Sequence, residues 1–256
     1  GAVIRYALLG LLQGLTEFLP VSSSGHLVLA RIALGVDAPG ATVAAAAHLG
    51  TLLSLFLYFR RDLCSLAVGL LRRGEERGYL ARLVVATLPV IVAGLLARDA
   101  IERAFGAPAL VGGMLLVTAL ALTIGDRRAS RARRDQVRIG DALAVGLAQA
   151  AALLPGISRS GATVATGIGL GLRPAHATRF SFLLAIPAIG GASLVALGGA
   201  SGGAGADWAS LAVTAGCAFA SGFVAIHLFL RIVRAGALWP FALYCALLGA
   251  AVLSWG

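Results

Sequence analysis

Long apolar segments alternate with short polar ones along most of the chain. Six segments are apolar over enough residues to cross the ~30 Å hydrocarbon core of a bilayer, for which a helix needs about 20 residues. They are Ala41–Phe59, Leu80–Ala97, Ala107–Gly125, Ala175–Leu197, Trp208–Leu230 and Ala237–Trp255. This pattern predicts an all-α polytopic membrane protein with six transmembrane helices.

Two further apolar stretches are interrupted in the middle. LPVSSSGH breaks the stretch Ala2–Ile32, and LPGISRSG breaks the stretch Ile139–Leu172. Proline, glycine and serine end helices and leave backbone groups without intrahelical partners. Within a bilayer such backbone is tolerated only where protein buries it or where it lines a wet cavity. We therefore predict two re-entrant helical hairpins, each entering and leaving on one side.

The two interrupted stretches resemble each other. At an offset of 136 residues, identical residues align: Gly10, Gln13, Ser22, Ser24, Gly25 and Val28 match Gly146, Gln149, Ser158, Ser160, Gly161 and Val164. Each hairpin precedes three spans, and because three is odd, the second copy begins on the opposite face. We predict a single membrane domain, 1–256, built as an inverted-topology repeat of roughly 1–125 and 139–256, which a basic cytoplasmic loop, 126–138, connects.

Composition supports a membrane location and argues against nucleic acid as a partner. Apolar residues make up 59% of the 256 residues and charged residues 12%, against about 25% charged in soluble domains. The net charge is +10, but all 21 basic residues are arginines and they cluster in short loops. Such clusters orient membrane proteins. The three cysteines are far apart and suggest neither a metal site nor disulfides.

Arginine counts predict the orientation. The loops Arg60–Arg82 and Arg127–Arg138 hold six arginines each. With these loops in the cytoplasm, and with them Arg173, Arg179, Arg231 and Arg234, 16 arginines lie inside and four outside. The loop Gly198–Asp207 has no arginine and falls outside. The positive-inside rule then places both termini outside, and the first hairpin opens toward the exterior or periplasm.

One acid and one base interrupt the apolar stretches. Of eleven acidic residues, ten lie in or beside loops and only Glu17 lies well inside an apolar stretch, and of 21 arginines only Arg159 does. An ionised group at this depth costs at least ~2.5–3.5 kcal/mol and usually marks function. The alternative is an ion pair that only locks the hairpins together.

Hydroxyl residues surround both breaks. Ser22, Ser23, Ser24 and His26 follow the first, and Ser158, Ser160 and Thr163 occupy the second. Serines and glycines at helix starts can present N–H groups to an anion, and arginine provides a planar fork that suits phosphate. Ordinary helix capping is the alternative for either turn alone. The two symmetric turns together favour a phosphate site.

Phosphate chemistry needs a nucleophile and a proton carrier. His26 lies three residues after Ser23, one helical turn away, so it can activate that hydroxyl or attack phosphorus itself. Glu17 can hold or deliver a proton. We interpret His48, which lies in an apolar span, as a packing residue.

The motifs QGLTEFLPVSSSGH (Gln13–His26) and LPGISRSGAT (Leu154–Thr163) closely resemble the two signatures of the bacterial undecaprenyl-diphosphatase family, the integral-membrane bacitracin-resistance type. The family's first motif carries Glu or Gln, three residues, then Glu. Here these positions are Gln13 and Glu17, which gives one carboxylate where a paired-acid metal site would need two.

The resemblance implies hydrolysis of undecaprenyl diphosphate to undecaprenyl phosphate and phosphate in the bacterial cytoplasmic membrane. This reaction recycles the lipid carrier for peptidoglycan synthesis and confers bacitracin resistance. The resemblance also implies a catalytic set and a substrate-binding set. The catalytic set is Glu17, Ser23, His26 and Arg159, and the substrate-binding candidates are Gln13, Ser22, Ser24, Ser158, Ser160 and Thr163.

The family is associated with Mg²⁺ or Ca²⁺, but the sequence builds no strong metal site, so we expect any ion to bind with the substrate's phosphates. The main alternative function is a transporter or flippase of a lipid phosphate or another anion, because inverted repeats and broken helices suit a carrier equally well. The sequence allows a homodimer without indicating one.

Overall fold

The computed structural model describes residues 2–34, 40–72, 75–198 and 207–255. These residues form twelve helices and no named strand. The helices are α1 (Ala2–Phe18), α2 (Ser23–Leu34), α3 (Ala41–Tyr58), α4 (Arg60–Arg72), α5 (Glu75–Leu96), α6 (Arg98–Ala104), α7 (Pro108–Ala129), α8 (Ile139–Ala151), α9 (Arg159–Gly169), α10 (Pro174–Gly198), α11 (Trp208–Arg234) and α12 (Trp239–Trp255).

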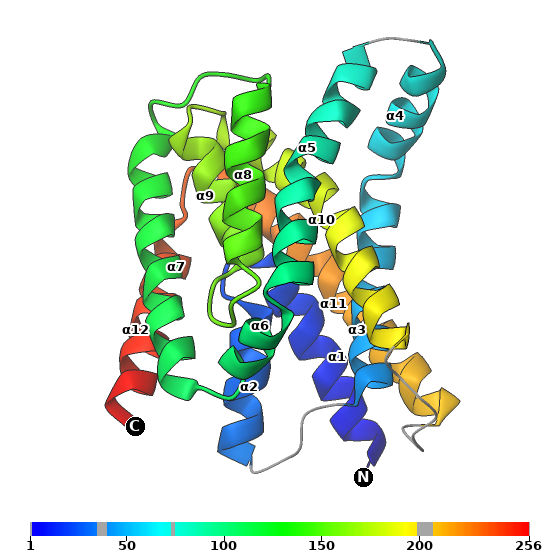
Figure 1. Cartoon of the computed structure of the whole chain (residues 1–256), viewed down its shortest axis with the longest axis vertical. Coiled ribbons are helices and arrows are strands. Elements are labelled where there is room, and N and C mark those ends of the chain that lie inside the picture. Colours follow the sequence, from blue (N-terminus) through cyan, green and yellow to red (C-terminus); the bar gives the residue numbers. More distant parts are fainter. Residues whose placement is uncertain (1, 35–39, 73–74, 199–206, 256) are drawn as a thin grey trace.

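Two helical hairpins open toward opposite ends of the bundle. In Figure 1, α1 runs from the N-terminus to the middle of the molecule and α2 returns to the same end. The pair α8 and α9 does the same from the other end, so the two turns lie in the middle. The chain is therefore broken at both places where proline, glycine and serine interrupt the apolar pattern.

Each hairpin packs against a long helix of the other half of the chain. A Cβ added at Gly10 of α1 would lie 2.3 Å from the Thr214 carbonyl oxygen on α11, and one at Gly146 of α8 would lie 2.5 Å from the Ala86 carbonyl oxygen on α5. Gly10 and Gly146 are equivalent at the 136-residue offset. Glycine at these positions lets the helix backbones approach closely, as in many membrane helix pairs.

Several helices are long and apolar enough to cross a membrane. Among the described residues five satisfy this by length and composition: α3, residues 76–96 of α5, α7, residues 174–195 of α10, and α11. The sixth predicted span corresponds to α12, a 17-residue apolar helix. Large apolar side chains face outward, with Leu95 77% and Leu96 83% exposed, while Phe182 and Phe229 are fully buried. The chain is an integral membrane protein.

Two segments that we expected to be loops are helical. The expected loop Arg60–Arg82 contains α4 and the first turns of α5, and α6 follows Ala97. Asp62 lies in the first turn of α4, where a negative charge is favourable, and the residues after it are mostly apolar, so this segment can form a helix. Nearly all of the predicted loop Gly198–Asp207 lies outside the described residues.

Candidate active site

The turn of the first hairpin is held in an unusual conformation. Ser22 has a φ of 68°, in the left-handed region that non-glycine residues rarely adopt. Its hydroxyl oxygen accepts hydrogen bonds from Gly25 N at 3.2 Å and from Gly156 N at 3.1 Å. Such backbone conformations cost about 1–3 kcal/mol and persist where the surroundings fix them, often at functional sites.

The turn of the second hairpin is fixed by capping and by α7. The Ser158 hydroxyl caps α9 by accepting a hydrogen bond from Gly161 N at 3.1 Å. Thr118 of α7 donates to the Gly156 carbonyl at 2.9 Å and accepts from Ser158 N at 3.0 Å. Gly156 has a φ of 101°, where any side chain would be strained.

The two turns contact each other directly. Besides the bond from Gly156 N to Ser22, the Ser160 hydroxyl donates to the Leu19 carbonyl at 3.2 Å. The two breaks in the apolar pattern therefore meet inside the molecule.

Glu17 lies at the centre of this junction and is 8% exposed. Its Oε2 accepts hydrogen bonds from the Ser23 hydroxyl at 2.7 Å and from Gln13 Nε2 at 3.0 Å. Its Oε1 accepts from Arg159 Nη2 at 2.9 Å. One carboxylate thus contacts both hairpins.

Arg159 retains donor capacity beyond this ion pair. Its side chain is 14% exposed, and its Nη1 is buried without a hydrogen-bond partner within the described part of the chain. A buried unpartnered donor of a charged group is costly. A phosphate oxygen bound at Nη1 would remove that cost, so the geometry favours an anion site beside Glu17 over a purely structural ion pair.

Among the described residues, His26 forms its side-chain hydrogen bonds with groups other than Ser23. Its Nδ1 lies 2.8 Å from the Ser22 carbonyl oxygen and its Nε2 lies 2.6 Å from the Tyr244 hydroxyl. The expectation that His26 activates Ser23 or attacks phosphorus itself stays a prediction, and the hydrogen-bond partner of the Ser23 hydroxyl in the structure is Glu17.

The remaining hydroxyl candidates mainly bind protein atoms. Ser22, Ser158 and Ser160 fix the turns as described above, and Thr163 lies 2.6 Å from the Ser181 hydroxyl. Ser24 is half-buried, with its hydroxyl 3.3 Å from that of Ser22. These contacts agree with helix capping as the role of the hydroxyl side chains. The starts of α2 and α9 nevertheless lie next to each other at the site.

Sequence reasoning missed two residues at the site. His48 of α3 is more than a packing residue, because its Nδ1 lies 3.3 Å from Gln13 Nε2. Tyr244 of α12 contacts His26. His48 is a polar residue in an apolar helix, and that position in the sequence could have revealed it. No local sequence pattern marks Tyr244.

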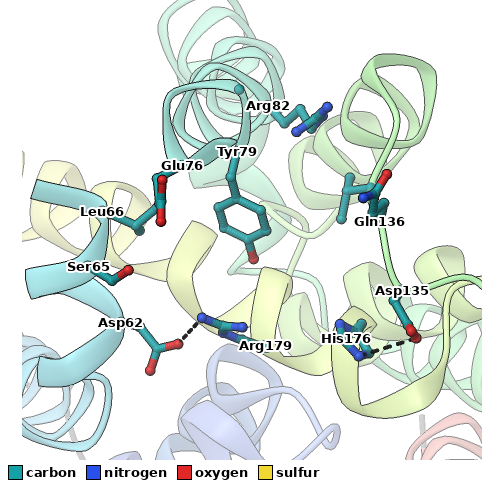
Figure 2. Close-up of a pocket in the computed structure, with 12 residues that line it drawn as sticks. Asp62, Ser65, Leu66, Glu76, Tyr79, Arg82, Asp135, Gln136, His176 and Arg179 are labelled. Atoms are coloured by element: carbon teal, nitrogen blue, oxygen red, sulfur yellow. Dashed lines mark ion pairs between the residues drawn. The ribbon is translucent and has the colours of Figure 1, made fainter. Parts of the chain in front are cut away.

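A polar cavity lies at the arginine-rich end of the bundle, away from both termini. It has a volume of 610 Å³ and is lined by α4, α5, α10 and the loop 135–137. Figure 2 shows two charged pairs in it, Asp62 with Arg179 and Asp135 with His176. No residue of the two hairpin turns lines it, so we assign it no part in the site around Glu17.

Within the described residues, no three or more histidine, cysteine, aspartate or glutamate side chains lie close enough together to hold a metal ion. Around Glu17 the donors are one carboxylate, an amide and an imidazole, and both carboxylate oxygens already accept hydrogen bonds. This donor set does not fit a metal held by the protein alone.

Comparisons with known proteins agree with the motifs. The family model described as "Bacitracin resistance protein BacA" matches residues 6–251. Proteins named undecaprenyl-diphosphatase are similar over most of both chains: 41% identity in Idiomarina loihiensis and 43% in Syntrophotalea carbinolica, each with 94% of both chains covered. The relative from Desulfosudis oleivorans is 42% identical, with 98% of this chain and 97% of the relative covered. Because the match extends over nearly the whole length, the chain belongs to the bacitracin resistance protein BacA family.

Proposed function

We propose that the chain is a membrane phosphatase that hydrolyses undecaprenyl diphosphate to undecaprenyl phosphate and inorganic phosphate. The observation that carries this proposal is the Glu17 carboxylate, which binds the Ser23 hydroxyl at 2.7 Å and the Arg159 guanidinium at 2.9 Å. A hydroxyl beside a base, next to a guanidinium with a free donor, suits attack on a phosphate.

The mechanism follows from these contacts. Arg159 binds the diphosphate through Nη1 and balances the charge that develops in the transition state. Ser23 attacks the terminal phosphorus while its proton passes to Glu17. The new bond joins Ser23 Oγ to phosphorus, and the bond to the bridging oxygen breaks, which releases undecaprenyl phosphate. Water then hydrolyses the phosphoserine and releases phosphate.

Ser23 is a better nucleophile than His26 in this arrangement. The His26 Nδ1 faces a carbonyl oxygen, which can only accept a hydrogen bond, so Nδ1 carries the proton. The Nε2 lone pair then accepts from the Tyr244 hydroxyl. Neither nitrogen is free to attack phosphorus, whereas the Ser23 hydroxyl already donates to a base.

Phosphate release by the detergent-purified protein tests the function. We expect release from undecaprenyl diphosphate, and we expect Glu17→Gln to lower kcat about 10²-fold or more because the general base is lost. Glu102→Gln is a matched control, since Glu102 is an exposed carboxylate that also pairs with an arginine. Wild-type protein without any release would disprove the function, and it would favour the carrier alternative.

The nucleophile is tested separately with substrate that carries ³²P in the terminal phosphate. Rapid acid quenching should trap label on Ser23, because phosphoserine is stable in acid. Ser23→Ala should abolish both the label and turnover. Label that survives only an alkaline quench and is retained in Ser23→Ala would assign the attack to His26, because phosphohistidine is lost in acid.

We further propose that six helices span the bilayer and that the two hairpins are re-entrant. The arms α2, α8 and α9 have 12, 13 and 11 residues, and each is shorter than the about 20 residues that a span needs. The pairing of each hairpin with the other half supports the inverted repeat of 1–125 and 139–256.

The location proposed is the bacterial cytoplasmic membrane, with the site facing the exterior. The arginine-rich loop 126–138 lies at the end of the bundle away from both termini (Figure 1). With that loop in the cytoplasm, the first hairpin opens outward. A divalent cation would arrive bound to the diphosphate, and no step above depends on one.

A further inference from the structure

A tyrosine from the last helix holds His26 from the side opposite the turn. The Tyr244 hydroxyl lies 2.6 Å from His26 Nε2, although 218 residues separate the two in the sequence. Their rings are nearly parallel, with centroids 5.7 Å apart and an interplanar angle of 8°. The contact is therefore a hydrogen bond between two rings that lie almost side by side.

The donor in this hydrogen bond can be assigned from the contacts of His26. The Ser22 carbonyl oxygen at 2.8 Å from Nδ1 can only accept, so the proton of the neutral imidazole is on Nδ1. Nε2 then has a lone pair, and the Tyr244 O–H donates to it. Both ring nitrogens are used, which fixes the tautomer and the orientation of the ring.

The next residue on α12 also touches the turn. Cys245 is fully buried, and its thiol lies 3.5 Å from the Pro20 carbonyl oxygen. α12 thus contacts the first turn at two consecutive residues, which places Tyr244 against the segment that carries Ser22, Ser23 and His26.

We propose that Tyr244 is a positioning residue for the phosphatase reaction: it fixes the imidazole of His26, whose Nδ1–H binds the Ser22 carbonyl oxygen and so holds the turn that presents Ser23 to Glu17. This inference rests on the proposed function. Tyr244 acts through His26 and not on the substrate, so its hydroxyl should affect turnover and leave substrate binding unchanged.

Steady-state kinetics of Tyr244→Phe test this role, since phenylalanine keeps the ring and removes only the hydroxyl. We expect kcat to fall about five- to tenfold, as for the loss of one hydrogen bond, with KM changed by less than about twofold. Tyr58→Phe is the matched control, because within the described residues Tyr58 forms a second tyrosine–histidine contact, with His227 at 3.4 Å, and this variant should leave kcat unchanged.

Two kinetic outcomes would overturn the proposal. One is a wild-type kcat in Tyr244→Phe. If Tyr244→Leu were impaired at the same time, turnover would depend on the ring of Tyr244 and not on its hydroxyl. The other is a rise in KM with unchanged kcat, which would make Tyr244 a substrate contact.

Nuclear magnetic resonance provides a readout that does not depend on activity. The chain has four histidines, so ¹⁵N-histidine labelling gives few signals, and His26→Gln assigns those of His26. We expect a protonated Nδ1 in the wild type and a shifted Nε2 resonance in Tyr244→Phe. An unchanged Nε2 resonance would disprove the contact. Absent phosphate release by the wild type would disprove the function and leave this test intact.

Discussion

At the scale of single residues, the site is organised around one shared carboxylate. Glu17 accepts hydrogen bonds from Gln13, Ser23 and Arg159, and Gln13 in turn lies near His48. The 136-residue offset makes Ser23 and Arg159 equivalent, while Leu153 takes the position of Glu17. At this offset the two hairpins therefore differ in chemistry, with the acid on one hairpin and its cationic partner on the other.

Replacing Arg159 by lysine should show that the guanidinium has two roles. Lysine keeps the charge but lacks a planar fork that can reach Glu17 and a phosphate together. We expect Arg159→Lys to lower kcat/KM by about 10²-fold or more, as for the loss of a donor that stabilises the transition state. The measurement is phosphate release at several substrate concentrations. Activity close to wild type would show that charge alone is sufficient.

Gln13 should orient Glu17 through its amide. Gln13→Leu removes the donor at 3.0 Å and keeps a side chain of similar size, so we expect kcat to fall about five- to tenfold. His48→Leu should have a smaller effect, because the imidazole contacts Glu17 only through Gln13. The two variants are compared by kcat, and a larger effect of His48→Leu would reverse this order of roles.

At the scale of elements, the two breaks were predictable because their signals are local. Proline, glycine and serine stop helices wherever they cluster, and a lone Glu17 or Arg159 stands out in apolar sequence. The helix α4 and the partners of His26 and Gln13 were not predictable from such signals. Tyr244 reaches His26 across 218 residues, and only the packing of α12 on the turn decides that contact.

The close contact between α1 and α11 should tolerate no side chain at Gly10. A Cβ there would lie 2.3 Å from the Thr214 carbonyl oxygen, so we expect Gly10→Ala to destabilise the protein by about 1–3 kcal/mol. Gly216→Ala on α11 is the control, since no atom lies within 4 Å of its added Cβ. Thermal unfolding in detergent compares the two, and equal midpoints would contradict the packing of α1 on α11.

At the scale of the whole molecule, the orientation can be tested by labelling single cysteines in a cysteine-free background. Asp99 of α6 and Arg133 of the loop 126–138 are both exposed. We expect a membrane-impermeant maleimide to label Asp99→Cys in intact cells, and Arg133→Cys only after the membrane is opened. The reverse pattern would place the Glu17 site on the cytoplasmic side.

Because Glu17 contacts both hairpins, the reaction depends on how the two halves of the chain are aligned with each other. A hydrogen bond weakens steeply once its atoms separate by more than a few tenths of an ångström. A small slide of one half along the other would therefore part Arg159 from the carboxylate, while Ser23, on the same half as Glu17, would keep its base. After such a slide Ser23 would still donate to its base, but Arg159 would no longer bind the phosphate. The active site is therefore complete only when the two halves are packed in the arrangement seen here.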